Sequence, residues 1–153
     1  MLFRPLDPNY ERKVRESFQR QGFMKFIGAN LIEVRPGYCE IHLPYKTELC
    51  QQHGFFHAGV IGTIADNSGG YAAYSLMAAD SSVFTVEYKM NLIAPADGDL
   101  LVGRGQVIKS GRTLTVCRTE VLVVKDGAEK LCATSLMTLI AMVGKADGPV
   151  ENS

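Results

Sequence analysis

The stretch HGFFHAGVIGTIADNSGGYAAY, from His53 to Tyr74, decides the fold. It has the composition of a buried helix, yet it contains one acid, Asp66. Apolar residues continue through it at spacings typical of a helix: Val60, Ile64, Tyr71 and Tyr74. This pattern predicts one helix that begins after His57 and ends at about Leu76.

Four glycines lie in this predicted helix: Gly59, Gly62, Gly69 and Gly70. Each glycine inside a helix costs about 1 kcal/mol relative to alanine, so tertiary packing must offset several kcal/mol. The simplest source is a sheet that approaches the helix backbone closely where side chains are absent. The alternative, that Gly69-Gly70 ends the helix early, remains open at this stage.

The flanking segments complete the fold class. Asp7-Pro8 begins a short amphipathic helix, with Tyr10, Val14 and Phe18 on one face and Gly22 as its stop. Six strand-like runs are separated by turn residues: Ala29–Val34, Tyr38–Leu43, Val83–Leu92, Leu100–Lys109, Thr113–Val124 and Glu129–Met142. Strands grouped around one helix indicate an α+β fold with an antiparallel sheet. One helix covers six strands only if the sheet curls around it.

Composition limits the class of protein. The chain has 153 residues, with 16 basic and 16 acidic side chains, so its formal net charge of zero argues against a general nucleic-acid binder. We expect an N-terminal helix over 1–24, one domain over 25–144 and a flexible tail over 145–153. The N-terminus lacks a signal-peptide pattern and the longest apolar run, Leu131–Gly144, is too short to span a bilayer, so we expect a cytoplasmic protein without membrane association. The cysteines show no C-x-x-C pair and are expected to be free thiols: Cys39, Cys50, Cys117 and Cys132.

Asp66 and the start of the predicted helix suggest a reaction centre. The first backbone amides after His57, those of Ala58 and Gly59, lack intrahelical partners and favour an anion. Asp66 lies nine residues beyond His57, near the opposite face of the helix. If amides and acid act together, they come from different subunits, which predicts a site at a dimer interface. A buried acid satisfied by a neighbouring hydroxyl, and a merely structural His57, are the simpler alternatives.

Three spaced motifs carry a family resemblance. The string H-A-G-x6-D, from His57 to Asp66, resembles the H-G-G-x6-D signature of the phenylacetate-type (PaaI-like) hotdog thioesterases. Residues 84–96 resemble that family's strand ending in N-x3-P-A, and residues 110–113 its G-[KR]-T turn. The order of elements matches over roughly residues 25 to 142. The resemblance implies a hotdog fold, a curved antiparallel sheet around a long central helix, in homodimers that often pair into tetramers. It also implies hydrolysis of acyl-CoA thioesters, here with a medium-chain or aromatic acyl group.

The resemblance also implies roles for individual residues. Asp66 matches the catalytic carboxylate, as general base or as nucleophile, and the sequence does not choose between these. The amide of Ala58, aided by Gly59, matches the oxyanion donor. Three further positions match supporting roles: Gln51 positions the thioester or water, Thr85 orients water and His57 supports the motif. Ala58 in place of glycine and Gln51 in place of asparagine depart from the family pattern.

Other readings are weaker. Arg112 is a candidate for CoA phosphate binding, with Gly111 beside it and Asn91 at the strand end; a solvated turn arginine is the simpler alternative. No cofactor beyond the CoA of the substrate is implied. The pattern C-x2-H-x3-H from Cys50 to His57 lacks a fourth zinc ligand, so we expect no metal. A non-catalytic acyl-CoA-binding domain on the same fold is the main rival, and an enoyl-CoA hydratase ranks lower because a separate Asp/His pair is missing.

Overall fold

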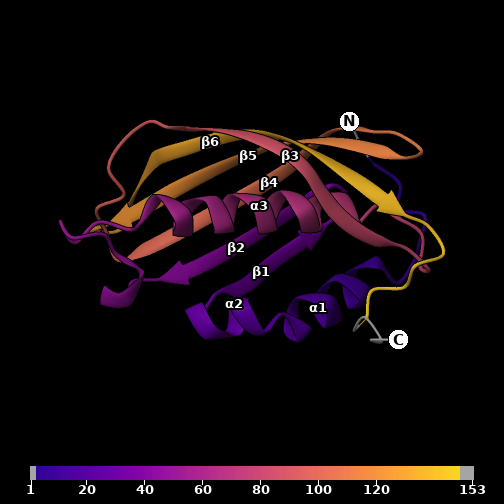
Figure 1. Cartoon of the computed structure of the whole chain (residues 1–153), viewed down its shortest axis with the longest axis horizontal. Helices are drawn as coiled ribbons and strands as arrows, with labels where there is room; N and C mark the ends of the chain where they lie inside the picture. Colours follow the sequence, from indigo (N-terminus) through magenta and orange to yellow (C-terminus); the bar gives the residue numbers. More distant parts are fainter. Residues whose placement is uncertain (1–2, 149–153) are drawn as a thin grey trace.

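The computed structural model describes residues 3–148 and consists of a long helix held in a curved antiparallel sheet (Figure 1). The helix, α3, spans Ala58–Tyr74 without interruption, so the alternative in which Gly69-Gly70 ends it is wrong. The six strands are β1 (Asn30–Arg35), β2 (Tyr38–Pro44), β3 (Ser82–Leu92), β4 (Leu100–Ser110), β5 (Leu114–Lys125) and β6 (Ala128–Met142). They lie in the order β1-β2-β4-β5-β6-β3, so β1 and β3 are the two edges. This is the hotdog fold that the sequence predicted.

Close approach between α3 and the sheet explains three glycines. A Cβ at Gly69 would lie 2.8 Å from Thr119 Cγ2 and would overlap Met137 of β6. On the other side of the contact, a Cβ at Gly103 would overlap Ile64, and one at Gly105 would overlap the Ser68 backbone. The helix backbone at Gly69 therefore packs directly against side chains of the sheet. This packing offsets the free energy that a glycine costs inside a helix.

The N-terminal segment forms two helices where the sequence predicted one. Helix α1 spans Tyr10–Arg20, Gln21 is extended, and Gly22 begins a second helix, α2 (Gly22–Ile27). The residue that stops the helical segment is Gly28, whose φ of +84° suits glycine. The first helix thus ends close to the predicted stop at Gly22, but the sequence did not predict that Gly22 begins a second helix.

Helix α1 is tied to the end of α3. Lys13 Nζ donates to the carbonyl oxygens of Met77 at 2.6 Å and Ala78 at 3.1 Å, and it lies 4.5 Å from the ring centre of Tyr74. Burial lowers the pKa of Lys13, although Asp7 opposes the shift. The apolar face of α1 carries Val14 and Phe18 into the core. These contacts place α1 beside the C-terminal end of α3, where it contributes to a hollow described below.

None of the helices within residues 3–148 is long and apolar enough to cross a membrane. The predicted flexible tail lies partly outside the described residues, since 149–153 are not described. Residues 145–148 follow β6 and return toward α1, where Arg20 Nη2 donates to Asp147 Oδ2 at 2.8 Å.

Candidate active site

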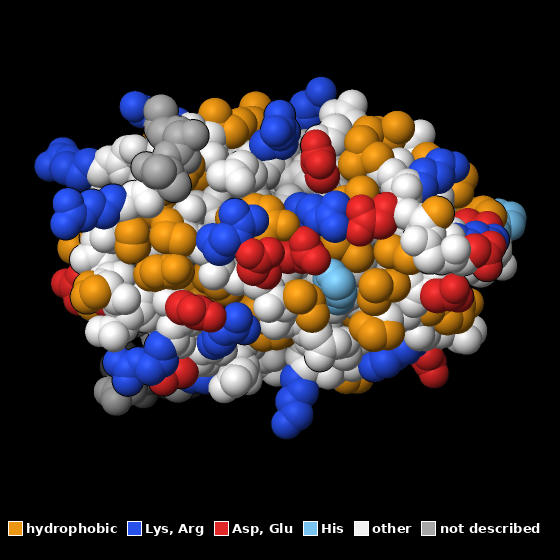
Figure 2. All heavy atoms as spheres, turned by 180° about the vertical axis from the view of Figure 1, so that it is seen from behind, with side chains coloured by type: hydrophobic (Ala, Val, Ile, Leu, Met, Phe, Trp, Pro, Cys, Tyr) orange, Lys and Arg blue, Asp and Glu red, His pale blue; other side chains and the backbone are white. Residues whose placement is uncertain are grey.

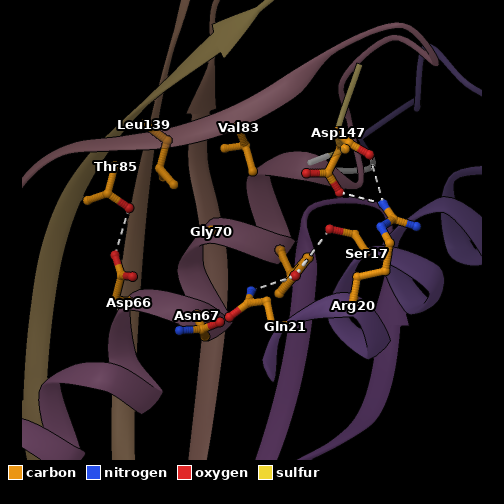
Figure 3. A pocket seen from close by; sticks show the side chains of 12 residues that line it. Ser17, Arg20, Gln21, Asp66, Asn67, Gly70, Val83, Thr85, Leu139 and Asp147 are labelled. Carbon is orange, nitrogen blue, oxygen red and sulfur yellow. Dashed lines mark hydrogen bonds and ion pairs between the residues drawn. The ribbon is translucent and has the colours of Figure 1, made fainter. Parts of the chain in front are cut away.

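Asp66 and Thr85 form one hydrogen-bonded pair between α3 and β3. Thr85 Oγ1 donates to Asp66 Oδ1 at 2.6 Å (Figure 3). Asp66 is half-buried and Thr85 is exposed, so the carboxylate is held in a fixed orientation while remaining accessible. The structure therefore brings together two of the predicted site residues. The hydroxyl occupies one carboxylate oxygen and leaves Oδ2 available.

A β-bulge in β3 sets the direction of Thr85. Thr85 pairs with Leu139 and Glu87 pairs with Thr138, so Val86 is an extra residue in the strand. Before the bulge Val83 and Thr85 face α3; after it the inward positions are Tyr88 and Met90, which lie against Gly62. Simple alternation would turn either Thr85 or Tyr88 away from the helix. The sequence carried no clear signal for this bulge.

A hollow of about 480 Å³ lies beside Asp66 (Figure 3). Asp66 and Thr85 line one end, and Val83, Leu139 and Gly70 line the middle. Its other end is polar and consists of Ser17, Arg20 and Gln21 from α1, Tyr71 from α3 and Asp147. The hollow is thus a passage along α3 that starts at a carboxylate, runs past the apolar Val83 and Leu139 and the polar Asn67, and ends at hydrogen-bonding groups.

Helix α3 begins with a capped first turn. His57 is the N-cap residue, and its Nδ1 accepts a hydrogen bond from the Gly59 amide at 2.8 Å. A ring nitrogen that accepts from an amide carries no proton, so neutral His57 holds its proton on Nε2. The Gly59 amide is therefore already satisfied. The Ala58 amide, in contrast, has no hydrogen-bond acceptor anywhere in residues 3–148, and Ala58 is exposed.

Gln51 lies in the turn that leads into α3. Its backbone amide donates to the Phe55 carbonyl at 2.9 Å, and its side-chain Oε1 accepts from the His53 amide at 3.0 Å. The side-chain oxygen of Gln51 is therefore engaged within the turn, and the hydrogens on Nε2 remain available as donors. Gln51, His57 and Ala58 all line a second hollow of about 640 Å³, together with Phe55 and Leu92.

Within one chain the two groups of site residues stay apart. Asp66 and Thr85 line the first hollow, whereas Gln51, His57 and Ala58 line the second, and no lining residue is common to both. A single chain consequently holds the acid at one hollow and the free helix amide at the other.

Strand β3 runs from the first hollow, which Val83 and Thr85 line, to the second, which Leu92 lines, and it is unusually exposed for an apolar strand. It forms one edge of the sheet, so one row of its backbone groups has no strand partner within residues 3–148. Its exposed side chains include large apolar ones: Phe84, Val86, Tyr88 and Leu92, each between 45% and 57% exposed. A long apolar edge strand is a typical pairing surface.

None of the candidate CoA contacts lines either hollow. The Gly111 amide donates to the Leu114 carbonyl at 2.8 Å and closes the β4–β5 hairpin, and Arg112 is exposed at its tip without an ion-pair partner in residues 3–148. The hairpin lies at the end of the molecule opposite the turn around Gln51 (Figure 1). Asn91 is exposed near the end of β3. One chain does not bring these residues to Asp66.

The outer face of the sheet carries an ion network centred on Arg104. Arg104 Nε donates to Glu40 at 2.9 Å, and its two terminal nitrogens hold Glu129 at 2.7 and 2.9 Å. Burial raises the pKa of Glu40, but hydrogen bonds from Arg104, Tyr38 and His42 outweigh it, so the pKa of this carboxyl lies below its usual value. Figure 2 shows the resulting band of acidic and basic side chains among apolar ones on this face.

The cysteines do not form a thiol site. Cys39, Cys117 and Cys132 are buried, and burial raises the pKa of Cys117 to about 12 and that of Cys132 to about 11. Within residues 3–148, no three His, Cys, Asp or Glu side chains lie close enough to hold a metal ion.

The polar end of the first hollow was not predicted from the sequence. Ser17, Arg20 and Gln21 recur at i, i+3 and i+4 on the N-terminal helix, a spacing that places them on one face. That spacing was a usable signal, but the docking of α1 beside α3 could not be deduced from it.

Comparison with known proteins agrees with this geometry. The family model described as "Thioesterase superfamily" matches residues 53–130. A thioesterase family protein from Silicibacter pomeroyi is 45% identical, with a TM-score of 0.87 over 88% of this chain and 99% of that one. The PaaI protein of the phenylacetic acid degradation operon of E. coli is 18% identical, with a TM-score of 0.80 over 92% of this chain and 99% of that one. A thioesterase from Haemophilus influenzae is 19% identical, with a TM-score of 0.77 over 94% and 96% of the two chains.

Proposed function

Because the chain belongs to the thioesterase superfamily and is a thioester hydrolase, we propose that it cleaves acyl-CoA thioesters of medium-chain or aromatic acids, with Asp66 as the group that drives the attack. The observation that carries this proposal is the Asp66–Thr85 pair at the mouth of the hollow beside α3. Thr85 fixes one carboxylate oxygen, so the other faces the space where the thioester carbon would lie. The apolar middle of the hollow suits an acyl group.

Two routes are consistent with this arrangement. As a general base, Asp66 takes a proton from water, the resulting hydroxide adds to the thioester carbon, and the C–S bond breaks to release CoA. As a nucleophile, Asp66 displaces CoA thiolate and forms a mixed anhydride, which water then hydrolyses. A single turnover in ¹⁸O-labelled water identifies the anhydride route when the product acid is unlabelled, whereas labelled acid is compatible with both routes. Unlabelled product acid requires transfer of an Asp66 oxygen, as occurs when water attacks the Asp66 carbonyl of the anhydride.

The developing oxyanion needs a donor, and the unpartnered Ala58 amide is the candidate. It lines a different hollow from Asp66, so the proposal places the two on different copies of the chain, paired through the exposed edge strand β3. Each homodimer then holds two sites, in which Asp66 and Thr85 of one copy face Ala58 and Gln51 of the other. Pairing of two dimers and CoA contacts by Arg112, Gly111 and Asn91 belong to the same proposal.

The test compares CoA release from a panel of acyl-CoAs by the wild-type chain and by Asp66→Asn. We expect Asp66→Asn to lower kcat by at least about 10²-fold, because the amide neither accepts the proton nor attacks. Asp126→Asn is the matched control: Asp126 is an exposed turn residue with φ of 52°, a conformation that asparagine tolerates.

Equal rates for wild type and Asp66→Asn would refute the role of Asp66. Tight binding of acyl-CoA without turnover by the wild type, across the whole panel, would favour the non-catalytic binding domain instead.

A further inference from the structure

Gly62 is a buried glycine of α3 whose nearest neighbour is a hydroxyl group. A Cβ at this position would lie 3.3 Å from Tyr88 Oη and 3.6 Å from Met90 Cε. The first of these contacts is tighter than ordinary van der Waals contact, so a side chain at Gly62 would displace the Tyr88 hydroxyl. The glycine therefore lets this phenol lie directly against the helix backbone.

The Tyr88 hydroxyl is a hydrogen-bonding group without a partner. The neighbouring Thr85 donates to Asp66 at 2.6 Å. Glu87 accepts a hydrogen bond from Thr138, also at 2.6 Å. Tyr88 Oη, in contrast, has no partner within residues 3–148, although the bulge in β3 turns this side chain toward α3. The phenol therefore remains able to donate to a ligand.

The position of this hydroxyl along α3 relates it to Asp66. Gly62 and Asp66 are one helical turn apart and are neighbours on the helix surface. The hollow beside Asp66 extends in the other direction, toward Gly70 and Tyr71. With the acyl group in that hollow, the thioester sulfur and the CoA beyond it point from Asp66 toward the turn where Gly62 and Tyr88 meet. The phenol thus lies on the leaving-group side of the carboxylate.

The departing sulfur is the one reacting atom for which the proposed reaction has no assigned group. Asp66 drives the attack, and the Ala58 amide stabilises the carbonyl oxygen. When the C–S bond breaks, its electron pair stays on sulfur, which then takes a proton. We propose that Tyr88 is a further catalytic residue, a general acid that donates this proton to the sulfur of CoA; this rests on the proposed function.

The step balances on either route of attack. The C–S bond breaks, the Tyr88 O–H bond breaks, and an S–H bond forms, which leaves a phenolate. The water that is consumed supplies its oxygen to the acid and, through Asp66 and solvent, a proton that restores the phenol. Thioester and water thus give acid and thiol, with Tyr88 unchanged at the end of the cycle.

The test compares one acyl group on two leaving groups: an acyl-CoA that the wild-type chain hydrolyses, and the same acyl group on 4-nitrothiophenol. The 4-nitrothiophenolate sulfur is a weak base and leaves without a proton, whereas the sulfur of CoA is more basic. We expect Tyr88→Phe to lower kcat on the acyl-CoA by about 10- to 100-fold, at the low end of general acid catalysis, because a thiolate leaves readily. On the nitrothiophenyl ester, kcat should stay within about twofold of the wild-type value.

Two further variants serve as controls. Tyr10→Phe removes the hydroxyl of a half-buried tyrosine in α1 that lines neither hollow, and it should leave both rates unchanged. Asp66→Asn should lower both rates, because the attack on the carbonyl carbon is needed for either leaving group. Thermal unfolding of each variant shows whether the fold is kept.

An equal loss on both substrates in Tyr88→Phe, or no loss on the acyl-CoA, would overturn the role of Tyr88 as general acid and leave the proposed function intact. No turnover of any acyl-CoA in the panel by the wild type would instead overturn the proposed function, and this inference with it.

Discussion

Single residues show that the glycines of α3 serve different ends. Gly69 is required by packing, since any side chain would overlap Met137 and press on Thr119. Gly70, its neighbour in sequence, faces a hollow and has room for a methyl group. The sequence alone could say only that four glycines in one helix need a compensating contact; which of them has that contact depends on the sheet.

The two glycines therefore predict opposite effects on stability. Gly69→Ala should lower the free energy of unfolding by about 1–3 kcal/mol through overpacking. Gly70→Ala should raise it by about 0.5–1 kcal/mol, because alanine favours the helix. Denaturant unfolding of both variants measures the difference, and each serves as the control for the other. A Gly69→Ala variant as stable as Gly70→Ala would contradict the close contact between α3 and the sheet.

At the scale of elements, two backbone amides at the N-terminus of α3 differ in a way that the sequence does not reveal. The Gly59 amide is held by His57 Nδ1, and only the Ala58 amide is free for a ligand. Ala58 is the first helical residue, a position that proline favours. His57, with ψ of 142°, already has the extended conformation that precedes proline.

Ala58→Pro should therefore delete the donor without disturbing the helix. We expect kcat on acyl-CoA to fall by about 10²–10³-fold, as for the loss of one oxyanion donor, with circular dichroism and unfolding temperature close to wild type. Ala58→Gly retains the N–H and is the comparison; its kcat should fall far less. An Ala58→Pro protein that folds normally and keeps its kcat would exclude this amide as the donor.

Prediction from sequence succeeded where one pattern determined one element. The apolar spacing along α3 and the turn residues between strands predicted the helix and the curled antiparallel sheet, and the resemblance of three motifs implied the hotdog class. It failed at Gly22, which begins α2, and it gave no sign of the bulge at Val86, because both depend on how distant segments pack. The Asp66–Thr85 contact agrees with the motif, whereas the polar cluster around Tyr71 required the docked position of α1.

At the scale of the whole molecule, the proposed function leaves each chain with two half-sites. The hollow at Asp66 lacks the free amide, and the hollow at Ala58 lacks the carboxylate, while the apolar edge of β3 lies between them. A twofold pairing along β3 would complete both sites at once, since a symmetric interface uses the same surface twice.

Mixing two inactive variants tests this directly. Asp66→Asn and Ala58→Pro should each be nearly inactive alone, but a heterodimer contains one site without either change. After co-expression or joint refolding, random pairing should restore roughly a quarter of the wild-type activity. The control is a mixture of each variant with itself. If mixing restores nothing although the chains exchange, the acid and the donor act within one chain.

The position of α1 has a consequence for how the lining of the hollow can change between related proteins. Lys13 anchors this helix to the chain beyond α3, and its C-terminal turn supplies Ser17, Arg20 and Gln21 to the end of the hollow farthest from Asp66. The lining of one hollow is thereby shared between separate stretches of polypeptide. Substitutions in the leading helix would reshape the far end of the hollow and leave Asp66 and Thr85 in place.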